Sequence, residues 1–357
     1  MLLFVAAISV ALSAPQGAQA AQKDEKPVSL NHVFSKGEKL EYSILSSLHV
    51  EMREYGLQTF IPDDMDLNYK FTTEVRDLKA DGVAVLHYLR PNMVQVDAAT
   101  FDKPSKTTVE KINMNYDLTI SPINAILDEK DLNPPKKKPA KTGDGGGDGS
   151  GLRLFGTHVA NRQNPLQAFM GQFVSEVYRL ALNVGSMDSA LDFSPKLPLD
   201  DVKVGDTWKS TVGYQPQKLQ GKNGKQAVQR LDYTFTYKGI VTVNGKPYYR
   251  VNAALSLNTD LGAFINQLMD AKPEETHLKS APLTLKQSID YDLDMATKRT
   301  ISARSKAEGA FSVNLTDTEE PVEEQKLSGS TEMRLIGVGV ATAPKAGTGH
   351  AGQSRGH

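Results

Sequence analysis

The sequence predicts a mainly β protein with one long amphipathic helix, an α+β fold in which antiparallel strands dominate. Three observations carry this prediction. Apolar and polar residues alternate along most of the chain, one long stretch near residues 164–185 has apolar residues at helical spacing, and three matched segments occur in the same order in both halves. Two arrangements fit them: duplicated curved antiparallel sheets, or one large half-barrel packed on the helix.

The alternation is clearest in the second half of the chain. Apolar and polar residues alternate over residues 230–238, and the pattern resumes after Asn244-Gly245, a pair that tolerates the positive φ of a tight hairpin. In residues 289–294, three apolar residues alternate with Asp290, Asp292 and Asp294. Antiparallel sheets typically have one apolar face and one solvent-exposed face, so we expect these aspartates to be exposed to solvent.

Matched segments indicate an internal duplication. The pairs are Leu67–Thr72 with Leu231–Thr236, Met114–Leu118 with Ile289–Leu293, and the glycine turns at Lys36–Glu38 and Lys203–Asp206. We therefore assign residues 28–133 to a first β-rich repeat and residues 195–340 to a second. The second repeat contains an additional short helical pattern over residues 261–269.

A strand followed by the long helix is expected between the repeats, over residues 154–194. Asn164 suits the N-cap, and Pro165 suits the first helical position, where its missing N–H costs nothing. The apolar stripe that follows must pack against something, and the open apolar face of a sheet is the natural surface. The residues predicted to line a ligand groove between helix and sheet are Leu166, Phe169, Met170, Phe173, Val177 and Tyr178.

Residues 1–20 have the features of a cleavable secretory signal peptide: a short apolar run, helix-breaking residues, and the small-x-small site Ala18-Gln19-Ala20. Residues 21–27 are expected to form a flexible lead-in, residues 134–153 a low-complexity linker or loop, and residues 341–357 a disordered tail. The sequence has no cysteine, which excludes lipid anchoring and disulfides. The expected location is periplasmic or extracellular, with no transmembrane segment after cleavage.

Composition and motifs argue against several classes of function. With 41 basic and 42 acidic residues, the net charge of −1 leaves no basic surplus for nucleic acid. The histidines show no metal-ligand spacing, and no nucleophile motif is supported by its context. We interpret the acidic runs Asp63–Asp66 and Glu319–Glu324 as solvated loops rather than acid pairs or cation ligands. Trp208, at the head of a strand, is more typical of a core anchor than of a sugar platform. No catalytic residue, metal site or cofactor is predicted.

Two resemblances follow from these features. The segment Lys203–Trp208, with the sequence KVGDTW, resembles a recurrent feature of poorly characterised bacterial exported β-rich proteins. A curved antiparallel sheet with an apolar helix against it resembles the half-barrels of periplasmic lipoprotein carriers and mycobacterial lipid-binding lipoproteins. That second likeness implies a hydrophobic ligand, although this chain lacks a lipidated cysteine and the simple carrier plan lacks a duplication. Neither resemblance supplies a functional residue.

The leading hypothesis is an exported, non-enzymatic protein that binds a lipid or other hydrophobic molecule between sheet and helix. One alternative is a structural or protein-interaction module of the cell envelope, with an envelope protein as its partner. A second alternative is a hydrolase whose site residues are scattered along the sequence and converge only in the fold.

Overall fold

The computed structural model describes residues 26–99, 104–111, 113–133, 165–182, 194–214 and 228–340. The predicted signal peptide, the low-complexity segment, the strand expected before the helix, Asn164 and the tail lie outside the described residues. So does the side chain of Leu166.

The described strands form antiparallel pairs in two successive meanders. The first contains β1 (Glu38–Glu54), β3 (Met65–Leu78), β4 (Ala84–Arg90), β7 (Met114–Ile120) and β8 (Ile126–Asp131). The second contains β9 (Thr207–Tyr214), β10 (Gln229–Val243), β11 (Lys246–Asp260), β13 (Pro282–Leu293), β14 (Thr300–Leu315) and β15 (Glu323–Val340). Four short strands add to them: β2 (Ile61–Pro62), β5 (Met93–Asp97), β6 (Lys106–Glu110) and β12 (Leu278–Ser280). The helices are α1 (Pro165–Leu182), α2 (Gly262–Met269) and α3 (Pro273–Thr276).

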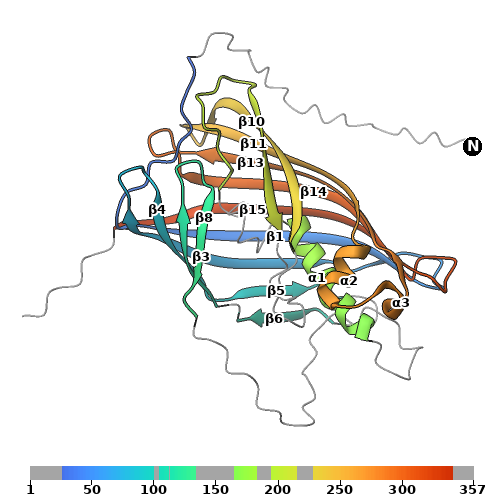
Figure 1. Cartoon of the computed structure of the whole chain (residues 1–357). Helices are drawn as coiled ribbons and strands as arrows, with labels where there is room; N and C mark the ends of the chain where they lie inside the picture. The colour runs from blue at the N-terminus through green and yellow to red at the C-terminus, as the bar shows by residue number, and fades with distance from the viewer. Residues whose placement is uncertain are drawn as a thin grey trace, which may run out of the picture.

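Pairing between β1 and β15 joins the two meanders into one sheet. Their register runs from Glu38 opposite Val340 to Glu54 opposite Glu323. The strand order is β8-β7-β4-β3-β1-β15-β14-β13-β11-β10-β9, so β8 and β9 are the two edges of an open sheet. Figure 1 shows this sheet as a curved surface with α1, α2 and α3 grouped near one end. The predicted mainly β, antiparallel character is confirmed, and the strands form one sheet rather than two.

The matched sequence segments occupy equivalent places in the two meanders. The Leu67–Thr72 and Leu231–Thr236 segments lie in β3 and β10, the second strand of each meander, and the downstream pair lies in β7 and β13, the fourth of each. The glycine turn before each first strand makes the same bond: the Gly37 N–H donates to the carbonyl of Val75, and the Gly205 N–H to that of Tyr237, both at 2.8 Å. Common ancestry of the halves stays a prediction.

The hairpin expected at Asn244-Gly245 is present between β10 and β11. Both residues have positive φ, 51° and 76°, which is the backbone shape of a two-residue hairpin turn. Only glycine and a few polar residues adopt this conformation cheaply, so the dipeptide fixes where the chain reverses.

The expectation that Asp292 is solvent-exposed is wrong, because its exposed fraction is 1%. Arg250, on the adjacent strand β11, lies 2.7 Å from one carboxylate oxygen, and Arg304 of β14 lies 3.2 Å from the other. The alternation correctly separates the two faces of β13, but long side chains from both neighbouring strands cover the aspartate.

His32 makes the stability sensitive to acid. Its ring stacks on Phe34 with 3.9 Å between centroids, and Nδ1 lies 3.3 Å from the Asn124 side-chain oxygen. Burial, helped by the charge of Arg299 and partly offset by Asn124, lowers the pKa of His32 from 6.5 to about 4. The folded protein therefore resists a proton that the unfolded chain accepts, and the free energy of unfolding falls by about 1.4 kcal/mol per pH unit from pH 6.5 towards 4.

The variant His32→Gln keeps a polar group but removes this titration. Thermal unfolding followed by circular dichroism at pH 7 and pH 4 is expected to show a smaller acid-induced drop in Tm for the variant than for the parent protein. An equal drop in the two proteins would contradict the assignment.

Candidate functional site

Helix α1 lies on the sheet where the two meanders meet, against β1, β14 and β15 (Figure 1). Of the predicted groove residues, Met170, Phe173, Val177 and Tyr178 are buried and Phe169 is partly buried. The Phe173 ring lies 6.2 Å from Phe311 of β14 and 6.3 Å from Phe264 of α2, centroid to centroid. The structure thus brings the described members of the predicted set together in the core between helix and sheet.

The C-terminal end of α1 is held by side chains of the sheet. The last carbonyls of a helix have no partner within the helix. Here Gln287 of β13 donates to the carbonyls of Leu180 and Ala181, at 3.3 and 3.0 Å, and Thr331 of β15 donates to that of Leu182 at 2.6 Å. These bonds fix where the helix ends on the sheet.

Strands on both sides of the curved sheet also contact α1. We call the side that contains the first meander the first wing and the side that contains the second meander the second wing. On the first wing, Glu110 of β6 accepts a 2.8 Å bond from Arg179. On the second, the Tyr214 hydroxyl of β9 donates to the carbonyl of Glu176 at 2.7 Å. Every residue from Glu176 to Leu182 is buried, so this part of the helix is enclosed on all sides rather than on one stripe.

Charged groups are buried beside the apolar contacts. Arg179 and Glu176 of α1 form an ion pair at 3.6 Å, and the buried Arg90 of β4 lies over the Tyr69 ring at 4.7 Å. Burial lowers the pKa of Arg179, Glu176 opposes this, and the positive charge of Arg90 lowers it further. Burial also raises the pKa of Tyr214 well above its usual value, and the Glu176 carboxylate adds to the effect. We refer to Arg90, Glu110, Glu176 and Arg179 as the charged cluster.

A second buried polar group lies at the start of β15. Glu323 is fully buried and accepts a hydrogen bond from Gln325. Burial, reinforced by Glu54 and partly opposed by Gln325, raises the pKa of Glu323 to about 8. Burial, and after it the charge of Glu323, raises the pKa of Tyr178 of α1 well above its usual value. The interpretation of Glu319–Glu324 as a solvated run is therefore wrong for Glu323, although Glu319 and Glu320 are exposed as expected.

Little empty space remains beneath the described part of α1. A cavity of about 10 Å³ touches Phe173, Glu176 and Tyr214. A second cavity, of about 20 Å³, lies near His32 and Tyr42. Each has room for about one water molecule at most. The side chains of α1 therefore fill the predicted groove themselves.

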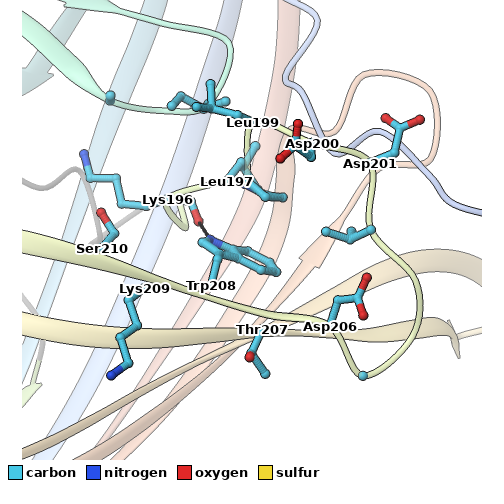
Figure 2. Close-up of a pocket in the computed structure, with 15 residues that line it drawn as sticks. Lys196, Leu197, Leu199, Asp200, Asp201, Asp206, Thr207, Trp208, Lys209 and Ser210 are labelled. Atoms are coloured by element: carbon cyan, nitrogen blue, oxygen red, sulfur yellow. Dashed lines mark hydrogen bonds between the residues drawn. The ribbon is translucent and has the colours of Figure 1, made fainter.

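A larger cleft of about 740 Å³ lies on the surface, between edge strand β9 and the turn that joins β7 to β8. In Figure 2, Trp208 is at its centre, with Asp200, Asp201 and Asp206 towards one side and Lys196 and Lys209 towards the other. The segment at residues 194–202 links the two sheet edges here, because the Leu197 N–H donates to the Ile123 carbonyl at 3.0 Å and the Lys196 carbonyl accepts a bond from Trp208 of β9.

Trp208 is anchored in this structure. Its indole N–H donates to the Lys196 carbonyl at 2.9 Å, as Figure 2 shows, and its ring stacks on Phe235 with centroids 5.8 Å apart. The sequence prediction of a core anchor agrees with this geometry. One face of the ring is thus occupied by Phe235 rather than by a sugar.

Among the residues that the structure describes, no three His, Cys, Asp or Glu side chains converge where they could hold a metal ion. In the same part of the chain, no helix combines the length and apolar character needed to cross a bilayer.

Sequence reasoning missed the charged cluster and Glu323. Glu176 and Arg179 do stand three residues apart on the predicted helix, a spacing that pairs side chains on one face. On a helix expected to bury one stripe, however, such a pair points to solvent. In the fold, contacts with Glu110 of β6 and Tyr214 of β9 help to enclose it.

Comparisons with known proteins give similarities of shape only. No family model matches the chain, and no curated protein sequence matches it. Lipovitellin is 11% identical over 87% of this chain, with a TM-score of 0.39, and the match spans 26% of the lipovitellin chain. OmpF of Salmonella typhi is 10% identical over 85% of this chain and 99% of its own, with a TM-score of 0.22. A domain named as an outer membrane lipoprotein-sorting protein, from Vibrio parahaemolyticus, is 8% identical over 86% and 87%, with a TM-score of 0.16.

Proposed function

We propose that this chain is an exported, non-enzymatic protein that binds a lipid or other hydrophobic molecule on the face of the sheet where α1 packs. One observation carries the proposal: the core between α1 and the sheet is a single apolar cluster that extends from β7 in one wing to β9 in the other. Helix α1 has 18 residues and contacts β1, β14 and β15, whereas the cluster also includes residues of strands at both sides of the sheet.

The ligand would take the place of side chains of α1. A pocket for a small hydrophobic ligand has a volume of about 300–1,000 Å³, far more than the cavities beneath the helix offer. An acyl chain can replace the apolar contacts of α1 with similar ones, so the exchange costs little in burial. The hydrogen bonds from Gln287 and Thr331 mark the end of the helix where its position is most strongly fixed.

A reversible cross-link between α1 and the sheet tests this proposal. An ideal Cβ atom on Gly329 of β15 lies 3.0 Å from Cδ2 of Leu182, so Leu182→Cys with Gly329→Cys introduces one thiol on each side of this contact between helix and sheet. Because the chain has no cysteine, the pair forms the only disulfide. We expect the reduced protein to bind a fluorescent fatty acid and the oxidised protein to bind it at least about tenfold more weakly.

A matched pair within the sheet controls for oxidation. Thr234→Cys with Ala254→Cys joins β10 to β11 at directly opposite positions and does not involve α1. Oxidation of this pair is expected to leave binding unchanged. Equal binding by the oxidised and reduced helix pair would show that α1 does not have to move. Native mass spectrometry of protein from its own host, with no lipid in any preparation, would contradict binding altogether.

A second function, a protein-interaction module of the envelope, is favoured by the edge strand β9. Among the described strands β9 pairs only with β10, and its other edge borders the 740 Å³ cleft. An extended peptide can add a strand to such an edge. A photo-crosslinker at exposed Lys209 should then capture one envelope protein in intact cells, and one at exposed Lys286 on central strand β13 should not. No capture at Lys209, or equal capture at both, would contradict this function.

A further inference from the structure

The charged cluster provides a cationic group at the border of the apolar core. The Arg179 side chain is 6% exposed, whereas that of its partner Glu110 is 28% exposed. Glu110 belongs to β6, a short strand that pairs with β5 outside the main strand order. Glu110 is therefore the member of this ion pair that solvent reaches.

Two arginines share this buried region. Arg90 is 1% exposed, and its positive charge adds to the effect of burial, which is the main cause of the lowered pKa of Arg179. Cations in a low-dielectric interior need an anion close by, and removing that anion without replacement is strongly unfavourable. Glu176 lies 3.6 Å from Arg179 and stays on the same helix, so displacing Glu110 leaves two arginines and one carboxylate in the charged cluster. A ligand that displaces Glu110 therefore restores the charge balance of the cluster only if it brings a negative charge of its own.

The apolar core borders Glu176, which forms an ion pair with Arg179. The cavity of about 10 Å³ touches Glu176 of the cluster and also Phe173 and Leu180 of α1. An acyl chain that replaced these apolar side chains would have its polar end near the Glu176–Arg179 ion pair. A cationic headgroup would face both arginines, and a neutral headgroup would not replace the negative charge of a displaced Glu110.

We infer that the ligand of the proposed site is an amphiphile with an anionic headgroup, a carboxylate or phosphate ester, which pairs with Arg179 in place of Glu110. This inference rests on the proposed function and adds the ligand class. Glu110 then acts as an internal competitor: it neutralises Arg179 in the empty protein and is displaced by the headgroup when ligand binds. Arginine suits this role, because its planar guanidinium matches carboxylate and phosphate oxygens in pairs.

Because Glu110 competes with the headgroup for Arg179, removing the charge of Glu110 is expected to strengthen ligand binding rather than weaken it. In Glu110→Gln the competing charge is gone, so we expect the affinity for oleoyl lysophosphatidic acid to rise about tenfold. Monoolein carries the same chain on glycerol without the phosphate, and its affinity is expected to stay within about twofold. In Arg179→Gln the affinity for the phosphate lipid should fall about tenfold while monoolein binding persists. The conservative Arg179→Lys should restore part of the loss.

The controls separate a binding role from a structural one. Glu38→Gln makes the same change in another ion pair, where Glu38 lies 2.6 Å from Arg299, and should alter binding of neither lipid. Circular dichroism melts show whether each variant is folded. Glycerol 3-phosphate alone is expected to bind at least about a hundredfold more weakly than the phosphate lipid, because it has no acyl chain.

Each other outcome overturns the inference in a recognisable way. Weaker or unchanged binding of the phosphate lipid by folded Glu110→Gln would make the Arg179–Glu110 pair purely structural. Tighter binding of both lipids would mean that the variant only loosens α1. Glycerol 3-phosphate binding as tightly as the lipid would point to a soluble phosphate ester. If monoolein and the phosphate lipid both fail to bind every variant and the parent protein, the proposed function itself fails.

Discussion

Glu323→Gln is expected to raise the Tm of the protein at pH 8 and to leave it almost unchanged at pH 4. The folded protein keeps a proton on Glu323 until about pH 8, because the carboxyl is buried beside Gln325 and near Glu54. In the unfolded chain this carboxyl loses its proton near its ordinary value of 4.5. Between these values the folded state binds one more proton than the unfolded state, so the free energy of unfolding decreases as the pH rises, by about 1.4 kcal/mol per pH unit.

Glutamine has nearly the same shape and cannot ionise, so the variant avoids this loss. The difference in stability should be near zero below pH 4.5, grow steadily, and level off above pH 8 at a few kcal/mol. Thermal melts at half-unit pH steps measure it. Glu324→Gln is the control, since the neighbouring side chain is 30% exposed and pairs with Arg53. A difference between Glu323→Gln and the parent protein that is the same at pH 4 and pH 8 would contradict the buried, protonated state.

Val177→Asp is expected to detach α1 from the sheet. Val177 is 3% exposed in the C-terminal half of the helix, and an aspartate there would place an unpaired carboxylate in the apolar core. The cost is about 3 kcal/mol or more, comparable with the burial energy of one or two large side chains of α1. The helix can escape this cost by leaving the sheet, so we expect a lower Tm, strong binding of a hydrophobic dye and rapid proteolysis within residues 165–182.

The same variant bears on the proposed function. With α1 released, the face of the sheet is open, and a fluorescent fatty acid should bind more tightly than to the parent protein. Ser175→Asp is the matched control, because Ser175 is only half-buried on the same helix. If Val177→Asp melts like the parent protein and gains no dye binding, α1 is not a packed part of the core.

The local elements could be predicted from the sequence because their signals are local. Alternation identifies β10 and β13, and the dipeptide Asn244-Gly245 marks the hairpin. The sheet order could not be predicted, because β1 and β15 pair across nearly the whole chain, from Glu38 to Val340, and period-two patterns do not specify partners.

The candidate site was predicted only in its apolar part. Phe173 and Val177 follow from helical spacing, whereas the burial of Glu176 and Arg179 depends on how far the sheet curves around α1. Glu323 is similar: a glutamate beside Pro321 in an acidic run favours a loop, but its place at the start of β15 opposite Glu54 encloses it. Charged residues are buried here by tertiary structure, which no local pattern reports.

The pairing of β1 with β15 also sets the order of events during folding. When the ribosome has produced residues 26–315, the first meander and most of the second are complete. Strand β15, which pairs with β1 on the side opposite β3, has not yet been made. Until β15 arrives, β1 is a long open edge, a surface on which incomplete chains can join one another. Contacts so distant in sequence make folding slow, which keeps the newly made chain unfolded for longer and dependent on protection from aggregation until its last strand is in place.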